Sequence, residues 1–260
     1  MIRPSDLENF SQGCATTYTL NSPYSITSWD YLGFAKEDLK EEKEDRTLVN
    51  ALSNAKRALH LQIDILTKTF GIMYINPKRR FDFPQKLDFC VKCGIVGPQI
   101  LRKINRLRNA VEHEYYVPDI NEVEDFIDIT ELFVAASDVI LRNFPHDIEF
   151  RSPEIDLFGI PKRGVGIVIE PSQGKVIIHI NDFIAEPRPN REDAEDIFRE
   201  YKERSKNLRD GDPLPDLPDE VRMKYYRAIS RKTKSVKIEF SVKDSPNYFE
   251  WVSFAITKRK

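Results

Sequence analysis

Apolar residues recur every three or four positions through much of the first half of the chain, which is the spacing of one face of an α-helix. The longest stretch runs from Leu48 to Phe70 and predicts an amphipathic helix that ends near Gly71. We expect a unit of roughly four helices between residues 46 and 143. The other three predicted helices of this unit cover residues 86–93, 98–111 and 123–140.

The remaining parts of the chain have different patterns. The first 28 residues lack helical spacing and are interpreted as extended or irregular, whereas the mixed charges of Glu37–Arg46 are typical of a solvated helix face. After Pro145 polar and apolar residues alternate, which indicates β-strands. The elements expected there are a hairpin over 164–180, a polar helix over 192–208, a loop over 210–218, a short helix over 219–229, and a second hairpin formed by 236–242 and 248–257.

These patterns predict an α+β protein with two domains. A helical domain with an irregular N-terminal segment is expected over residues 1–150, followed by a smaller α+β domain with two β-hairpins over residues 151–260. The charges also differ between the two parts: 18 Lys and Arg against 23 Asp and Glu give the first a net −5, and 22 against 19 give the second a net +3. The total of −2 gives no sign of the strongly basic face that is usual in nucleic-acid-binding modules, so only local clusters of cations can indicate such a partner.

Composition narrows the protein class. The chain has 40% hydrophobic residues, and none of its apolar runs approaches the ~20 residues of a membrane-spanning helix. Three Cys are too few for a disulfide scaffold, and the residues after Met1 do not form an apolar secretory core. We therefore expect a cytoplasmic protein with no membrane partner.

Several familiar site signals are incomplete. The segment Gln173–Val176 lacks the first Gly and the Ser or Thr of a phosphate-binding loop, and Gly164-x-Gly166 lacks the third Gly of a dinucleotide site. Cys90 and Cys93 have the spacing of half a zinc site, and we interpret them as buried helix residues, the alternative being a functional thiol pair or a metal shared between subunits. We expect no metal and no cofactor. The other histidines, His60, His146 and His179, are isolated and are interpreted as packing or surface residues.

The segment from Leu101 to Tyr116 differs from an ordinary amphipathic helix. At about 100° per residue, Arg102, Arg106 and His113 lie opposite the apolar stripe, together with Asn109. Two guanidinium groups beside an imidazole suit a phosphate, and their charge favours the neutral imidazole that a general base needs. The alternative is an exposed polar face that contains a histidine. Arg108 lies about 140° from His113 on a straight helix, so the two can share a ligand only if the helix ends or bends, or if a second subunit supplies one of them.

The stretch Arg108-Asn109-Ala110-Val111-Glu112-His113 resembles the Arg-x4-6-His motif of the HEPN superfamily of small helical domains. The order of a long helix, a short helix, the motif helix and a further amphipathic helix over residues 46–143 is similar to the HEPN arrangement. The continuation His113-Glu114-Tyr115 is similar to HEPN toxins whose tyrosine is nucleotidylated by a partner antitoxin. Residues 151–260 resemble no family that we recognise.

The resemblance implies a metal-independent endoribonuclease of toxin or antiviral-defence type, formed as a homodimer through the motif helices. In such a site His113 is the general base for a ribose 2′-OH, Arg108 stabilises the charge on the phosphorane, and Asn109 orients the pair. The partner is RNA because the attacking group is the 2′-OH. Arg102, Arg106 and the loop Lys78-Arg79-Arg80 are candidates for contacts with flanking phosphates, the alternative being a solvated basic face.

Two other functions stay open at this point. One is a non-catalytic HEPN helical module that acts in protein assembly or in nucleotide or RNA binding. The other is a regulatory substrate, in which a partner enzyme such as an antitoxin modifies Tyr115 and silences the ribonuclease.

Overall fold

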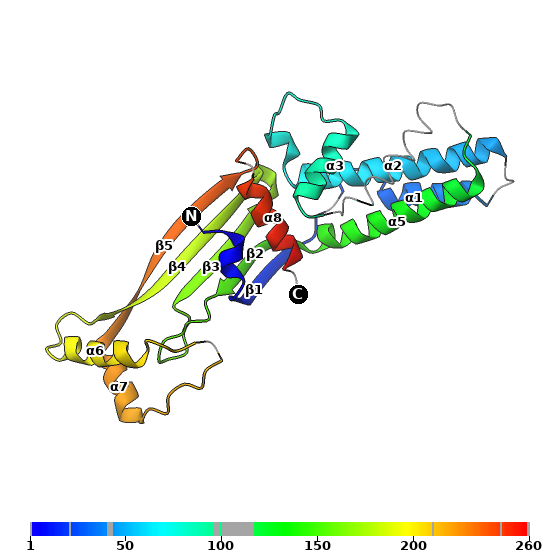
Figure 1. The fold of residues 1–260 in the computed structure, drawn as a ribbon. Coiled ribbons are helices and arrows are strands. Elements are labelled where there is room, and N and C mark those ends of the chain that lie inside the picture. Colours follow the sequence, from blue (N-terminus) through cyan, green and yellow to red (C-terminus); the bar gives the residue numbers. More distant parts are fainter. Residues whose placement is uncertain are drawn as a thin grey trace. The chain divides into compact units, whose positions relative to one another are not determined.

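The computed structural model describes residues 2–20, 22–40, 44–95, 99, 117–209, 211–244 and 246–258. The chain divides into two compact units (Figure 1). We call the first the helical unit, which comprises Thr17–Pro145, Ile169–Val176 and Phe240–Lys260. The second is the strand unit, which comprises Met1–Thr16, His146–Val168 and Ile177–Glu239. The two units are interleaved along the chain, so each is built from segments that are far apart in sequence.

The centre of the helical unit is α2 (Asp45–Thr69), which packs against both α1 (Ser28–Asp38) and α5 (Ile120–Arg142). The apolar stripe expected for the long helix is buried, including Ala55, Leu59 and Ile63, and the prediction of this helix is confirmed. The predicted helix over 123–140 is also confirmed as α5. Asp119 caps it, because its carboxylate accepts a hydrogen bond from the backbone N–H of Glu122.

Polar contacts fix the direction in which these helices run. Trp29 Nε1 donates to Asp138 Oδ2 at 3.4 Å, and Lys36 Nζ lies 2.6 Å from Glu131 Oε1, so α1 runs antiparallel to α5. A buried hydrogen bond of 2.9 Å from Gln62 Nε2 to Ser137 Oγ joins α2 to α5. Figure 1 shows α2 and α5 side by side over much of their length.

Helix α1 was not expected, and the mixed-charge run Glu37–Arg46 does not form one helix. Helix α1 ends at Asp38 within this run, and α2 begins at Asp45. The start of α1 is set by Thr27, whose hydroxyl accepts a hydrogen bond from the backbone N–H of Asp30 in a capping box. Charged residues are favourable at the ends of helices as well as on their exposed faces. The run Glu37–Arg46 therefore fits the end of one helix and the start of the next as well as it fits the face of a single helix.

Two shorter helices, α3 (Phe83–Lys92) and α8 (Asn247–Thr257), complete the helical unit. Helix α3 confirms the predicted short helix. Helix α8 corrects the expectation of a strand over 248–257. Its buried residues are Tyr248, Phe249, Trp251, Val252, Ala255 and Ile256, which repeat with the helical period of three and four. Short apolar runs rich in aromatic residues fit a strand as well as a helix, and burial on one helical face decided the outcome.

Five described strands form one antiparallel sheet in the order β1-β2-β3-β4-β5. They are β1 (Ser11–Tyr18), β2 (Phe144–Arg151), β3 (Arg163–Glu170), β4 (Lys175–Pro187) and β5 (Ile229–Ser241). Residues Asp147 to Arg151 of β2 pair with Val168 to Gly164 of β3. The sheet replaces the two separate hairpins that we expected, since β5 pairs with β4 and β1 comes from the N-terminal segment.

The hairpin of β3 and β4 is confirmed, and it turns through the short 3-10 helix η3 (Pro171–Gln173). Gly174 closes the turn with φ +61°, and a Cβ at this position would lie 2.8 Å from Cδ2 of Tyr74. The close approach therefore requires glycine. Two other 3-10 helices are Pro4–Leu7 (η1) and Ile72–Tyr74 (η2).

The strand unit has its own small core between α6 (Ala194–Arg204) and α7 (Asp219–Ala228). Both helices confirm predicted ones, and the loop expected over 210–218 separates them. The core residues are Leu157, Ile197, Tyr201, Leu217, Tyr225, Ala228 and Ile229. None of the described helices has both the length and the apolar character needed to cross a membrane.

Candidate functional site

The residues that the sequence analysis proposed for RNA cleavage lie outside the described part of the chain. On the N-terminal side of these residues the structure describes α3 and the chain to Ile95, and then Gln99. On the C-terminal side it describes the chain from Val117, which precedes α5. Both flanking helices belong to the helical unit. The roles of the candidate residues therefore stay predictions. These residues are Arg102, Arg106, Arg108, Asn109, His113 and Tyr115.

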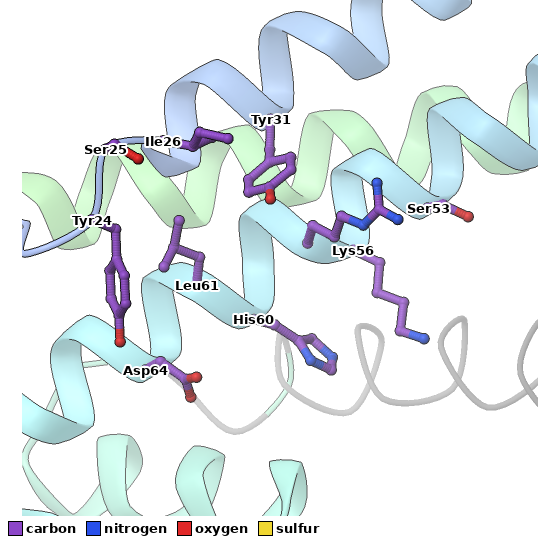
Figure 2. Close-up of a pocket in the computed structure, with 10 residues that line it drawn as sticks. Tyr24, Ser25, Ile26, Tyr31, Ser53, Lys56, His60, Leu61 and Asp64 are labelled. Atoms are coloured by element: carbon purple, nitrogen blue, oxygen red, sulfur yellow. The ribbon is translucent and has the colours of Figure 1, made fainter.

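The helical unit contains a groove of about 590 Å³ along the polar side of α2, which we call the α2 groove (Figure 2). Ser53, Arg57 and His60 are spaced four and three residues apart on this helix, so they face the groove from one side. The opposite wall comes from α1 and the segment before it. The side chains used below are Tyr24, Tyr31, Lys56, Arg57, His60 and Asp64, all of which line the groove.

Two tyrosine rings of the α2 groove are held in place by neighbouring side chains. The hydroxyl of Tyr24 accepts a hydrogen bond from Lys68 Nζ, and this ammonium lies 4.9 Å from the centroid of the Tyr24 ring. The ring of Tyr31 packs edge-on against Phe34, with a centroid distance of 6.1 Å. Tyr24 and Phe34 are 39% and 44% exposed. Aromatic rings fixed at a surface in this way can stack on planar ligands.

Two cationic side chains, Lys56 and Arg57, are among the described residues that line the α2 groove. Arg57 Nη1 donates to the Asn54 side-chain oxygen at 3.1 Å, and because the amide is neutral, this bond orients the guanidinium without cancelling its charge. The carboxylate of Asp64 forms an ion pair of 2.6 Å with Lys86 of α3. The guanidinium of Arg57 is therefore a candidate contact for an anionic group.

His60 is placed by packing. Its ring stacks on Phe83 at the start of α3, with a centroid distance of 4.3 Å and an interplanar angle of 21°. This contact confirms the interpretation of His60 as a packing residue.

The basic loop Lys78-Arg79-Arg80 is exposed in the structure. The guanidinium of Arg79 lies 5.2 Å from the centroid of the Phe81 ring. Its contact with phosphate stays a prediction.

Cys90 and Cys93 are buried on α3 and at its end, as the sequence analysis expected. Burial raises the pKa of the Cys90 thiol to about 12, and it raises the pKa of Cys93 well above its usual value. A reactive or metal-binding cysteine needs its thiolate, which this environment disfavours. Packing therefore accounts for the pair.

The strand unit contains a polar cluster around Asp156. One carboxylate oxygen accepts from Tyr201 Oη at 3.0 Å and from Arg231 Nη2 at 2.7 Å, and the other accepts from the backbone N–H of Phe158 at 2.8 Å. The Arg231 guanidinium also lies 4.7 Å from the Phe158 ring centroid. Burial, followed by the nearby charge of Asp156, raises the pKa of Tyr201. These contacts connect α6 and β5 to the loop before β3, so we assign the cluster a role in stabilising the strand unit.

A second hollow of about 470 Å³ lies over the strands of the strand unit. It forms where Gly164 and Gly166 place no side chains over the sheet. Its charged lining residues are of both signs, with Asp147 and Glu149 beside Arg151. This mixture of charges favours neither an anion nor a cation.

Comparison with protein-family models, with characterised proteins and with solved structures finds no match for this chain. The HEPN resemblance therefore depends on the motif and the helix order alone.

The residues of the α2 groove were not identified from the sequence. The polar stripe on α2 was visible as a repeat of three and four, but the apolar stripe alone was used to predict the helix. Tyr24 and Tyr31 gave no such signal, because only the packing of α1 on α2 brings them beside Arg57.

Proposed function

We propose that the chain is a metal-independent endoribonuclease whose chemistry is carried by Arg108, Asn109 and His113. His113 takes the proton of a ribose 2′-OH, the freed oxygen attacks the adjacent phosphorus, and the 5′-oxygen leaves. Arg108 stabilises the negative charge that develops on the phosphorane, and Asn109 orients the pair. The products are a 2′,3′-cyclic phosphate and a 5′-hydroxyl.

The observation that carries this proposal is the Arg-x4-His motif in the sequence between α3 and α5. The order of a long helix α2, a short helix α3 and a further long helix α5 along the chain supports the proposal. The proposal includes a site shared by two chains, because a single straight helix would direct Arg108 and His113 apart.

The test is cleavage of single-stranded RNA by the full chain in the presence of EDTA, with products analysed for a cyclic phosphate end. We expect His113→Ala to abolish cleavage while its circular dichroism spectrum stays that of the wild type. His179→Ala, a histidine change in the strand unit, is the matched control and should cleave normally.

Identical RNA patterns from the wild type and His113→Ala would refute catalysis and favour the non-catalytic module. The shared site has a separate test in the solution mass. A dimer of the 30.3 kDa chain supports it, and a monomer at the concentrations where RNA is cut contradicts it.

A further inference from the structure

We propose that strand β1 is a pairing edge, at which a second copy of this chain adds its own β1 in the antiparallel direction to form one continuous sheet. Strands β1 and β5 are the two edges, because the described strands follow the order β1-β2-β3-β4-β5. No other described strand pairs with the outer side of β1. The inference is independent of the proposed ribonuclease chemistry.

The two edges of the sheet differ in the features by which proteins protect an edge from further pairing. Charged side chains, above all lysine, and proline discourage another strand from joining an edge. Strand β5 carries the exposed residues Lys232, Lys234 and Lys237. Strand β1 has the sequence Ser-Gln-Gly-Cys-Ala-Thr-Thr-Tyr and is the only described strand with neither a charged residue nor a proline. The edge at β5 is therefore protected, and the edge at β1 is not.

Strand β1 is also accessible over most of its length. Successive side chains of a strand point to opposite faces of the sheet. Gln12 and Cys14 on one face and Ala15 and Thr17 on the other are all exposed. In the neighbouring strand β2, by contrast, Ile148 is buried. The covered part of the sheet thus ends before β1, and an added strand would meet an edge of eight residues.

A second copy is the occupant that leaves no unprotected edge. Two β1 strands bring no like charges opposite one another, because β1 carries no charge. The joined sheet ends at two β5 strands, which are both protected by lysine, so pairing through sheet edges stops at two copies. An unrelated extended peptide would instead leave its own outer edge open.

Symmetry restricts the register of this pair. The joined sheet keeps its buried face on one side only if the two-fold axis is perpendicular to it, and a residue at the axis then lies opposite its own copy. We place Cys14 at the axis, because it is the middle residue of Ser11–Thr17 and because the ring of the next residue, Tyr18, packs against Phe144. The seven paired residues of each copy would form about six to eight backbone hydrogen bonds.

The first experiment measures the solution mass of the full chain over a concentration series. Ala15→Lys places two like charges at diagonal positions on one face of the pair. It should lower the mass from twice 30.3 kDa to that of one chain, or from a larger assembly to a dimer if the motif helices also pair. Thr233→Lys adds the same charge at an exposed position of β5 and should leave the mass unchanged.

The second experiment uses Cys14 as a reporter and needs no variant that could fail to fold. Directly opposite residues of an antiparallel pair have Cα atoms about 4.5–5.5 Å apart, within the range of about 4.4–6.8 Å that a disulfide spans. Cys14 is exposed, whereas Cys90 and Cys93 are buried. Mild oxidation of the folded chain with diamide should therefore give a covalent dimer on a non-reducing gel, and Cys14→Ser should give none. Adding Ala15→Cys to Cys14→Ser tests the register one residue later.

A wild-type chain that is a monomer at every concentration would overturn the proposal. So would equal masses for the wild type and a folded Ala15→Lys variant, because the association would then use another surface. A dimer that is cross-linked neither through Cys14 nor in the double variant would also contradict it. These outcomes do not depend on whether His113→Ala changes RNA cleavage, so the β1 pairing and the ribonuclease can fail separately.

Discussion

Tyr248 connects two distant parts of the helical unit through one buried hydrogen bond. Its hydroxyl donates to the backbone carbonyl oxygen of Phe70 at 2.8 Å, and both residues are 0% exposed. Phe70 is the C-cap residue of α2, and Tyr248 lies in the first turn of α8, 178 positions later. The change Tyr248→Phe removes this hydrogen bond and keeps the ring.

The expected loss of stability follows from what remains after the change. The Phe70 carbonyl stays buried without its donor, and an unsatisfied buried polar group costs about 1–3 kcal/mol. Removing the whole ring would add a cavity and raise the loss to about 3–5 kcal/mol, so Tyr248→Phe isolates the hydrogen bond. The predicted loss corresponds to a fall in Tm of roughly 2–12 °C for a chain of this size.

Urea unfolding monitored by tryptophan fluorescence measures this loss of stability in the helical unit. Both tryptophans of the chain, Trp29 and Trp251, lie in the helical unit, and Trp251 is in α8 itself. Tyr226→Phe is the matched control, since Tyr226 is 53% exposed and its change should stay within about 0.5 kcal/mol. A shift for Tyr248→Phe no larger than that of the control would show that the hydrogen bond does not stabilise the fold.

Two further predictions concern α3 and its C-terminal end. Gly94→Ala should destabilise the helical unit by at least about 1–2 kcal/mol in the same urea assay, which is roughly the cost of φ +76° for a residue with a Cβ. The added Cβ would also lie 2.4 Å from Ser253 Oγ, so the second change Ser253→Ala should restore part of the lost stability. An unchanged stability in both variants would refute the contact. Above pH 9 the unfolded chain releases the Cys90 proton before the folded chain does, so the free energy of unfolding should fall by about 1.4 kcal/mol per pH unit until about pH 12. Cys90→Ala should reduce this slope, whereas Cys14→Ala, at an exposed position, should not, and equal slopes would contradict the burial argument.

Local patterns predicted the elements whose burial follows one simple period. Residues close together in the sequence determine three such features: the apolar stripe of α2, the Asp119 cap of α5 and the turn at Gly174. Helix α8 was missed because the run Tyr248–Ile256 is apolar enough for either period, and packing against α3 decides between them. Local sequence patterns also could not predict that β1 joins the sheet, because β1 pairs with β2, whose residues lie more than 120 positions later in the chain.

The candidate sites divide in the same way. The Arg-x4-His motif lies within six residues and is visible in the sequence. The α2 groove joins Tyr24 and Tyr31 to residues about thirty positions later, and no periodicity connects the two segments. The period of apolar residues identifies the buried face of a helix, but the polar residues on its other face do not identify a ligand. Polar residues occur wherever a helix faces water, whether or not a ligand binds there.

The charge of the chain limits how the proposed RNA contacts can work. Residues 1–150 contain the motif and the α2 groove and carry a net −5, so the field at long range does not attract a polyanion. In the proposed ribonuclease, association then depends on contacts at short range, where the Debye length of about 8 Å at physiological salt still lets Arg108 act on a bound phosphate. The total salt slope should accordingly correspond to only a few phosphate contacts, and a steep slope would place the main RNA surface elsewhere on the chain.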